Sequence, residues 1–198
     1  VSVARIGRDT VSGTITVFSD DYQEYNADAV LITIGLNYRR HSAKNIGQLL
    51  GKGIYYGAPA IRLPMDGECN VAVIGAANSA GQAAVKLAEN PKARVHLFAR
   101  SKIEDKMSSY LIDKIKTKTN ITVCEGCEIE EVCGRERLTG MIVHKQVGHN
   151  EYDNAHMSMD YMFIFIGASP KTFWLDSSIQ LDKDKYILTG TDVKPGSG

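Results

Sequence analysis

Apolar residues along this chain either alternate with polar residues or form unbroken runs. These two patterns, and the points where one changes to the other, predict where its strands lie. Near the start, TITVFSDD alternates apolar with polar residues, and EYNADAVLITIG passes from alternation into a nearly unbroken apolar run at Ala29–Ile34. Alternation is typical of a half-buried strand, and an unbroken run of a strand covered on both faces. The pattern predicts a hairpin that leads into a buried strand ended by Gly35.

A strand, a glycine turn and a helix follow one another in the middle of the chain. The apolar strand NVAVIG precedes AANSAGQAAVKLAENPKA, whose apolar positions have helical spacing up to Pro91. RVHLFAR predicts a second buried strand, SKIEDKMSSYLIDKIKTKTN a second helix, and ITVCEG a third strand. This β-α-β-α-β order predicts parallel strands joined by right-handed crossovers.

Glycine and Asn/Asp turns then separate three strand-like stretches, EIEEVCG, LTGMIVHKQ and AHMSMDYMFIFIG. They predict an antiparallel meander laid on the parallel sheet, with a last buried strand at Tyr161–Ile166 ended by Gly167. The predicted fold class is α/β, a Rossmann-like parallel sheet with an antiparallel β-meander. We place domain boundaries near Gly53 and Gly167.

Composition and charge narrow the classes of partner. Lys plus Arg number 23 and Asp plus Glu number 23, so no net charge attracts the chain to nucleic acid or an anionic membrane. There is no run of about 18 apolar residues and no signal-peptide pattern at the start. Four cysteines are too few for a disulfide scaffold of this size. We expect a cytoplasmic protein with reduced thiols, a small-molecule ligand, and no nucleic-acid or membrane partner.

The turn after NVAVIG has the features of an anion site. A strand that ends in glycine and enters a helix directs backbone N–H groups and the positive helix end at an anion, and a pyrophosphate fits there. The candidate residues are Gly75, Ala76, Ala77, Asn78, Ser79 and Ala80. The dinucleotide fingerprint has glycine where Ala77 stands, and the added methyl group would weaken ligand contact. On the loop alone, an ordinary α/β turn explains the glycine equally well.

Arg100 stands at the end of the next predicted strand, where dinucleotide-binding proteins recognise the ribose. An Asp or Glu there accepts hydrogen bonds from the ribose hydroxyls of NAD, whereas arginine suits the 2′-phosphate of NADP. Here Arg100 is followed by Ser101 and Lys102. We therefore predict that the site binds NADPH in preference to NADH. The alternative is that these basic residues only face solvent and bind no ligand.

Thiols and imidazoles give weaker signals. The pair Cys124 and Cys127 has the CxxC spacing of a redox dithiol or half of a zinc site, but it follows a predicted strand rather than opening a helix. No second ligand pair has zinc spacing, and the histidines lack partners at catalytic or metal spacing. His96 is expected to be a satisfied core histidine. We assign no catalytic and no metal-binding residue.

VAVIGAANSAGQAAVKLAENPKARVHLFAR and YMFIFIGASPKT resemble the NADPH domain of low-molecular-weight thioredoxin reductases, class II pyridine nucleotide-disulfide oxidoreductases. In that family the NADPH domain is inserted into an FAD domain, and ADAVLITIGLNYRR and GASPKT resemble the exit and the return. The resemblance implies a partial FAD-domain segment at 1–53, the NADPH domain at 54–166 and a partial return to the FAD domain at 167–198. It also implies cofactor contacts from Gly35, Ile166 and Gly167.

The chain departs from the family pattern in two ways. It has neither the N-terminal glycine fingerprint for FAD nor the C-terminal Gly-Asp segment, which implies a fragment that does not retain FAD and is inactive when isolated. Gly57-Ala58-Pro59-Ala60 stands where thioredoxin reductases carry their redox CxxC. The resemblance thus implies a homodimeric FAD-dependent parent that passes hydride from NADPH to flavin, with a small-molecule or small redox-protein acceptor.

Two alternatives stay open. The missing dithiol and the alanines of the phosphate loop also fit a regulatory module that senses NADP(H) without turnover. A CxxC redox protein that uses Cys124 and Cys127 is the third hypothesis, and it requires thiols that differ from ordinary, independently titrating cysteines.

Overall fold

The computed structural model describes residues 1–9, 11–57, 65, 67–146 and 152–193, and the chain divides into two compact units. Unit 1 combines Val1–Asn37 with Ala168–Gly198, and unit 2 is the continuous stretch Tyr38–Gly167. The first boundary between the two units follows Asn37, whereas the sequence predicted a domain boundary near Gly53. Residues 38–53 pack with unit 2 because Ala43 and Leu49 belong to one of its cores.

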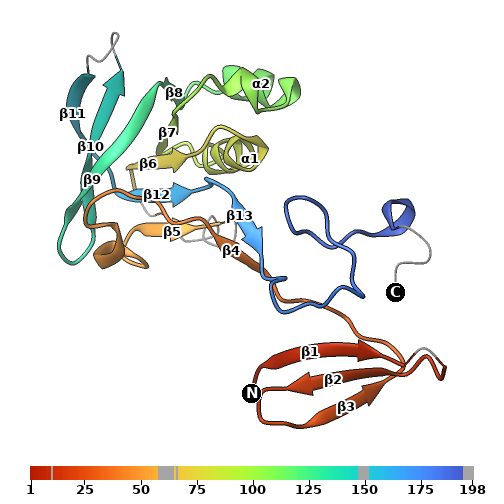
Figure 1. Cartoon of the computed structure of the whole chain (residues 1–198). Helices are drawn as coiled ribbons and strands as arrows, with labels where there is room; N and C mark the ends of the chain where they lie inside the picture. Colours follow the sequence, from red (N-terminus) through yellow and green to blue (C-terminus); the bar gives the residue numbers. More distant parts are fainter. Residues whose placement is uncertain (10, 58–64, 66, 147–151, 194–198) are drawn as a thin grey trace. The chain divides into compact units, whose positions relative to one another are not determined.

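Unit 2 is built on a parallel sheet of five described strands in the order β5-β12-β6-β7-β8 (Figure 1). The strands are β5 (Ile54–Tyr56), β6 (Cys69–Ile74), β7 (Ala93–Ala99), β8 (Ile121–Glu125) and β12 (Tyr161–Ile164). The predicted β-α-β-α-β unit is confirmed, because β6, α1 (Asn78–Leu87), β7, α2 (Ser109–Lys116) and β8 follow in that order. Parallel neighbours require such crossovers.

The predicted antiparallel meander is also confirmed. It consists of β9 (Cys127–Gly134), β10 (Leu138–Gln146) and β11 (Tyr152–Ser158), with β10 in the centre. Short 3-10 turns complete the unit at η1 (Ile46–Leu49) and η3 (Ile103–Asp105).

Two cores lie on opposite faces of the parallel sheet and make unit 2 a three-layer structure. On β6, Val71 and Val73 pack with α1 and α2, while Ala72 and Ile74 pack with the meander. Successive side chains of a strand point to opposite faces. Both faces are therefore covered, which explains why these strands appear in the sequence as unbroken apolar runs.

The second helix begins later than its pattern suggested. Residues from Ser101 onward first form η3, and α2 starts only after its N-cap Ser108. The two helices approach closely at Gly81, where an added Cβ would lie 2.7 Å from the Met107 sulfur. Packing of Met107 against α1 thus separates η3 from α2.

Unit 1 contains a three-stranded antiparallel sheet of β1 (Val3–Arg8), β2 (Ile15–Ser19) and β3 (Glu24–Ala27), in that order. The predicted hairpin is confirmed in β2 and β3. The C-terminal part contains η4 (Gly190–Asp192), and the buried Thr172 hydroxyl donates to the Lys185 carbonyl at 2.7 Å.

The prediction of a buried strand at Ala29–Ile34 is wrong. These residues form no strand, and Leu31 is 87% exposed. An extended segment becomes a strand only when another strand accepts its hydrogen bonds, and none of the described strands pairs with this one. The strand forms just beyond Gly35 instead, as β4 (Leu36–Tyr38), which pairs with β13 (Ala168–Pro170).

Candidate functional site

The turn between β6 and α1 is held at Gly75 from two sides. The Gly75 N–H donates to the Phe98 carbonyl of β7 at 2.9 Å. Its φ of 149° is one that residues other than glycine rarely adopt, and a Cβ here would stand 2.6 Å from the Phe165 carbonyl oxygen, just after β12. Glycine is therefore required where the chain leaves β6 between its two neighbouring strands.

The first turn of α1 is accessible. Its N-cap Ala77 is extended, with φ −100°, and no side chain caps the helix. Ala77, Asn78 and Ser79 are exposed, Ala76 is half-buried, and Ala80 is fully buried in the helix-side core. First-turn N–H groups lack acceptors within a helix and carry its positive dipole end. This turn can hold a pyrophosphate on its exposed side.

The two polar side chains of this turn have different roles. Asn78 does not cap its own helix, because its Oδ1 accepts a hydrogen bond from the N–H of Ser108 at 2.8 Å and so links α1 to the N-cap of α2. Its Nδ2 is still able to donate. The Ser79 side chain has no hydrogen-bond partner among the described residues, so its hydroxyl is available to a ligand.

Arg100, Ser101 and Lys102 form a loop directly after β7, at the same sheet edge as Gly75, because β6 and β7 are parallel neighbours. The Arg100 side chain is 79% exposed, and its Nη1 lies 3.7 Å from Glu128 Oε1. Lys102 is exposed and Ser101 half-buried. The structure thus brings the predicted pyrophosphate loop and the predicted 2′-phosphate residues to the carboxyl ends of adjacent strands, where open α/β sheets bind ligands.

His41 and Glu128 belong to this edge and were missed from the sequence. Burial, with a contribution from the charge of Arg100, lowers the pKa of His41, and Glu128 opposes the shift. The His41 N–H donates to the Tyr56 hydroxyl at 2.8 Å, and its Nδ1 accepts from the Ala43 N–H at 3.1 Å. Both residues come from segments far from Arg100 in the sequence. The only available signal was the position of Glu128 just beyond a buried parallel strand.

The three remaining predicted residues lie apart from the phosphate loop in the chain. Ile166 and Gly167 follow β12 at the edge that carries Gly75; Ile166 packs against the meander-side core, and the Gly167 carbonyl accepts from the Arg39 N–H at 3.0 Å. Gly35, with φ 67°, belongs to unit 1. The structure therefore groups Ile166 and Gly167 with the phosphate loop and assigns Gly35 to the other unit.

The CxxC thiols have the properties of structural cysteines. All four cysteines are free. Burial raises the pKa of Cys124 and of Cys127, while the charge of Lys145 opposes both shifts. The Cys127 thiol donates to the Glu125 carbonyl at 3.4 Å. A reactive thiol needs a lowered pKa, so this environment argues against a redox dithiol here.

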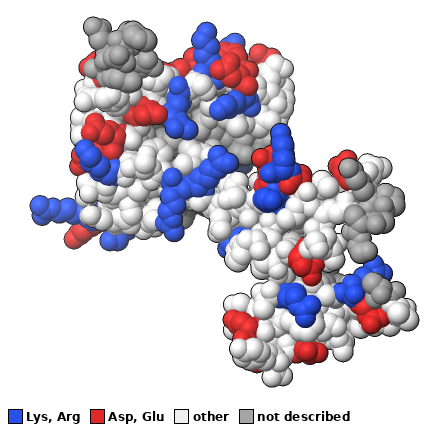
Figure 2. Space-filling view, viewed as in Figure 1, with Lys and Arg blue, Asp and Glu red and all other residues white. Residues whose placement is uncertain are grey.

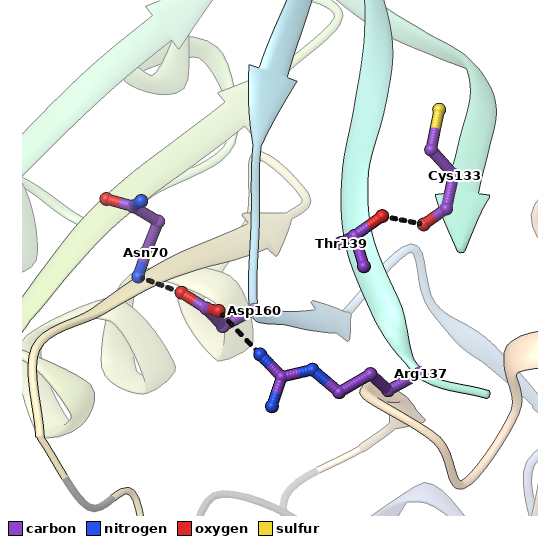
Figure 3. Close-up of polar contacts among 5 residues, drawn as sticks. All are labelled: Asn70, Cys133, Arg137, Thr139 and Asp160. Carbon is purple, nitrogen blue, oxygen red and sulfur yellow. Dashed lines mark hydrogen bonds and ion pairs between the residues drawn. The ribbon is translucent and has the colours of Figure 1, made fainter. Parts of the chain in front are cut away.

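A cavity of about 300 Å³ lies at the opposite edge of the sheet, where β5, β6 and β12 begin. Its polar groups serve the fold. Asp160 Oδ2 accepts from the Asn70 N–H at 2.9 Å and its Oδ1 from Arg137 at 3.4 Å; outside the cavity lining, the Thr139 hydroxyl donates to the Cys133 carbonyl (Figure 3). Asp160 thereby fixes the start of β12 to the start of β6. Burial, with the charge of Asp160, raises the pKa of Cys69 beside it.

Charges are mixed over the surface. Lys and Arg lie among Asp and Glu on the face that Figure 2 shows, in agreement with the zero net charge. Within the described ranges, no three His, Cys, Asp or Glu side chains gather where a metal ion could bind. No helix in the described part of the chain has the length and apolar character needed to cross a membrane.

The profile of the family described as "Pyridine nucleotide-disulphide oxidoreductase" matches residues 1–194. Among curated relatives, an alkyl hydroperoxide reductase component of Staphylococcus aureus (strain NCTC 8325 / PS 47) is 29% identical over 159 residues, which are 80% of this chain and 30% of the relative. Its counterpart in Staphylococcus epidermidis (strain ATCC 35984) is 28% identical over 164 residues, 82% and 31% of the two chains. The chain thus spans about a third of the length of these relatives.

Solved structures share the fold. Thioredoxin reductase of T. acidophilum superposes with a TM-score of 0.74 at 24% identity, over 96% of this chain and 60% of that one. Thioredoxin reductase of Lactococcus lactis gives a TM-score of 0.72 at 17% identity, over the same shares of the two chains. At these identities the likeness shows a thioredoxin reductase-like fold, as the sequence predicted.

Proposed function

Since this chain belongs to the pyridine nucleotide-disulphide oxidoreductase family, we propose that unit 2 binds NADPH and that the whole protein passes a hydride from NADPH to FAD. The membership makes the protein an oxidoreductase. The proposal adds which nucleotide it uses and which residues hold it.

The geometry of Gly75 carries the proposal. Glycine lets the chain leave β6 close to Phe165, and the first turn of α1 that follows is exposed and has no side-chain cap. A pyrophosphate needs such close access to backbone N–H groups. Arg100 ends the adjacent strand with its guanidinium exposed, which suits the additional 2′-phosphate of NADPH.

NADPH supplies the hydride when it is bound, and the FAD of the whole protein accepts it. The residues of this chain bind and orient. The first turn of α1 would hold the pyrophosphate, and Arg100 with Ser101 and Lys102 would hold the 2′-phosphate. From the resemblance we also propose cofactor contacts by Gly35 in unit 1 and by Ile166 and Gly167 in unit 2. No side chain of this site has to donate or remove a proton for hydride transfer, because the cofactors perform that chemistry.

We propose an acceptor other than thioredoxin, either a small molecule or a small redox protein. The sequence has Gly57-Ala58-Pro59-Ala60 where the thioredoxin reductase pattern has its dithiol; residues 58–60 lie outside the described residues, so this point rests on the sequence. The curated relatives are named as components of alkyl hydroperoxide reductase, which supports the same conclusion. We further propose that the whole protein is a cytoplasmic homodimer and that this chain, which spans about a third of its curated relatives, is inactive by itself.

Calorimetric titration with NADPH and NADH tests the nucleotide site. We expect this chain to bind NADPH more tightly than NADH, and Arg100→Gln to remove most of the difference. Hydrogen bonds to charged groups contribute about 1.5–3 kcal/mol, so the loss for NADPH should be about 10- to 150-fold. NADH binding should change little, because it lacks the 2′-phosphate.

Arg94→Gln is the matched control. Arg94 is an exposed arginine near the start of β7, the strand that precedes Arg100, and it pairs with Glu68 at 2.7 Å. Equal affinity for both nucleotides, or equal effects of the two substitutions, would reject the 2′-phosphate assignment. In the whole protein, NADPH binding without reduction of the flavin would instead favour the sensing module.

A further inference from the structure

The β8–β9 turn places two carboxylates against the loop that follows β7. Glu125, the last residue of β8, accepts a hydrogen bond from the Ile103 N–H through its Oε1 at 2.7 Å. Glu128, the second residue of β9, lies 3.7 Å from the Arg100 guanidinium. The Arg100–Lys102 loop is therefore contacted by acids at both of its ends.

The backbone positions Glu128 firmly. Gly126 makes the turn with φ 66°, Cys127 and Glu128 pair with Lys145 and His144 on β10, and the Glu125 hydrogen bond fixes the turn to the start of η3. The side chains of Arg100 and Glu128 are 79% and 62% exposed, so they are free to rearrange on this backbone. An exposed pair at this distance stabilises the fold little.

The same pair has a direct effect on an anionic ligand. A carboxylate that forms an ion pair with a guanidinium offsets the positive charge that a phosphate would meet. Burial and the charge of Arg100 lower the pKa of His41, which favours its neutral form, and the charge of Glu128 opposes this shift. A neutral His41 does not replace the positive charge that Glu128 offsets at Arg100.

We propose that Glu128 sets the nucleotide preference of this site by competing with the 2′-phosphate for Arg100. The inference rests on the proposed function and adds the residue that limits the discrimination between NADPH and NADH. With Glu128 present, the 2′-phosphate competes with a carboxylate 3.7 Å from Arg100 for the same positive charge. Without Glu128, that charge is offset less.

Glu128→Gln tests the competition, since it keeps the size of the side chain and removes its charge. In titrations of the full chain, we expect NADPH to bind up to about five-fold more tightly, the range set by an exposed ion pair. The probe 2′-AMP should gain by the same factor, whereas NADH and 5′-AMP should not change. Glu130→Gln is the control, because Glu130 lies on the same strand and pairs with Lys44 at 3.1 Å, away from Arg100.

Repeating Glu128→Gln in a protein that already carries Arg100→Gln distinguishes competition for Arg100 from simple repulsion between Glu128 and the phosphate. If Glu128 acts through Arg100, Glu128→Gln gives no gain in that background. A gain of equal size there, or an equal gain in Glu130→Gln, would overturn the inference. An NADPH preference that depends on Arg100 and not on Glu128 would overturn it while leaving the proposed function intact. Loss of all nucleotide binding, or of any dependence on Arg100, would reject the proposed function and the inference together.

Discussion

His96 is a polar residue in a strand that is otherwise nearly all apolar. Its ring stacks against Phe98 at a centroid distance of 6.2 Å, and its buried Nδ1 has no hydrogen-bond partner within the described part of the chain. The sequence predicted a satisfied core histidine, and the structure contradicts this. Burial lowers the pKa of His96, so the folded state resists its protonation.

We expect this histidine to make the protein less stable in mild acid. Unfolded histidine takes up a proton near pH 6.5, and the folded protein does so only at lower pH, so the unfolded state binds more protons between the two values. The free energy of unfolding is then highest above about pH 7 and falls as the pH drops through this range. Urea unfolding from pH 5 to 7.5 should show a shallower fall for His96→Gln. An unchanged slope, or the same change in the exposed His156→Gln, would contradict this role.

The residues of the candidate nucleotide site show how much can be predicted from positions in the sequence alone. Arg100 stands where a strand-end ligand residue is expected, and the structure places it at the edge that carries Gly75. Its contact with Glu128 was not predictable, because it depends on how the β8–β9 turn folds back toward β7. Asn78 similarly holds Ser108 rather than its own helix, a contact that helix-capping patterns do not contain.

Strand ends in unit 2 are connected by side chains, and Asp160 is the main example. It exchanges backbone and side-chain hydrogen bonds with Asn70, since its own N–H donates to the Asn70 carbonyl at 2.9 Å and its carboxylate accepts from the Asn70 N–H. Arg137 reaches the same carboxylate from solvent at 3.4 Å, with its side chain 74% exposed. The two contacts should differ in strength because only one involves a half-buried backbone group.

Asp160→Ala should lower the free energy of unfolding by about 1–3 kcal/mol, because it leaves the Asn70 N–H without its acceptor. Arg137→Ala should cost less than about 1 kcal/mol, as exposed ion pairs do. Urea denaturation of both variants measures the difference. Equal losses would show that the ion pair, and not the backbone hydrogen bond, fixes the start of β12.

Element prediction succeeded where the sheet is covered on both faces. The runs in β6, β7 and β12 are mostly apolar because helices lie on one face and the meander on the other. Ala29–Ile34 has the same composition and forms no strand, because strand formation depends on a partner that the pattern does not reveal. The start of α2 was displaced for a related reason, since Met107 packs against Gly81 on another helix.

The two units differ in how much apolar surface they bury. Both hydrophobic cores belong to unit 2, whereas Ile6 is the buried hydrophobic residue of unit 1 among the described residues. Burial of apolar surface is the main favourable contribution to folding. The stability of the chain is therefore concentrated in Tyr38–Gly167.

A chain cut to residues 38–167 should fold independently. We expect the circular dichroism of a mixed α/β domain, one cooperative urea transition, and NADPH affinity within about two-fold of the longer chain, since a separate core is what an autonomous domain requires. A chain of residues 1–37 joined to 168–198 is the counterpart, and it should show no cooperative transition. Loss of the transition in the cut chain would show that unit 2 depends on unit 1.

The pairing of β4 with β13 has a consequence for the order of folding. The Arg39 N–H and the Gly167 carbonyl, near the two ends of unit 2, meet at 3.0 Å. Unit 2 separates the two parts of unit 1 in the sequence, so it acts as one very long loop in the folding of unit 1. Closing a loop has an entropic cost that grows with its length. When unit 2 folds first, its two ends already lie together, and the loop is closed before unit 1 forms. We therefore expect that, during synthesis, the first part of unit 1 packs with its second part only after unit 2 has been made and has folded.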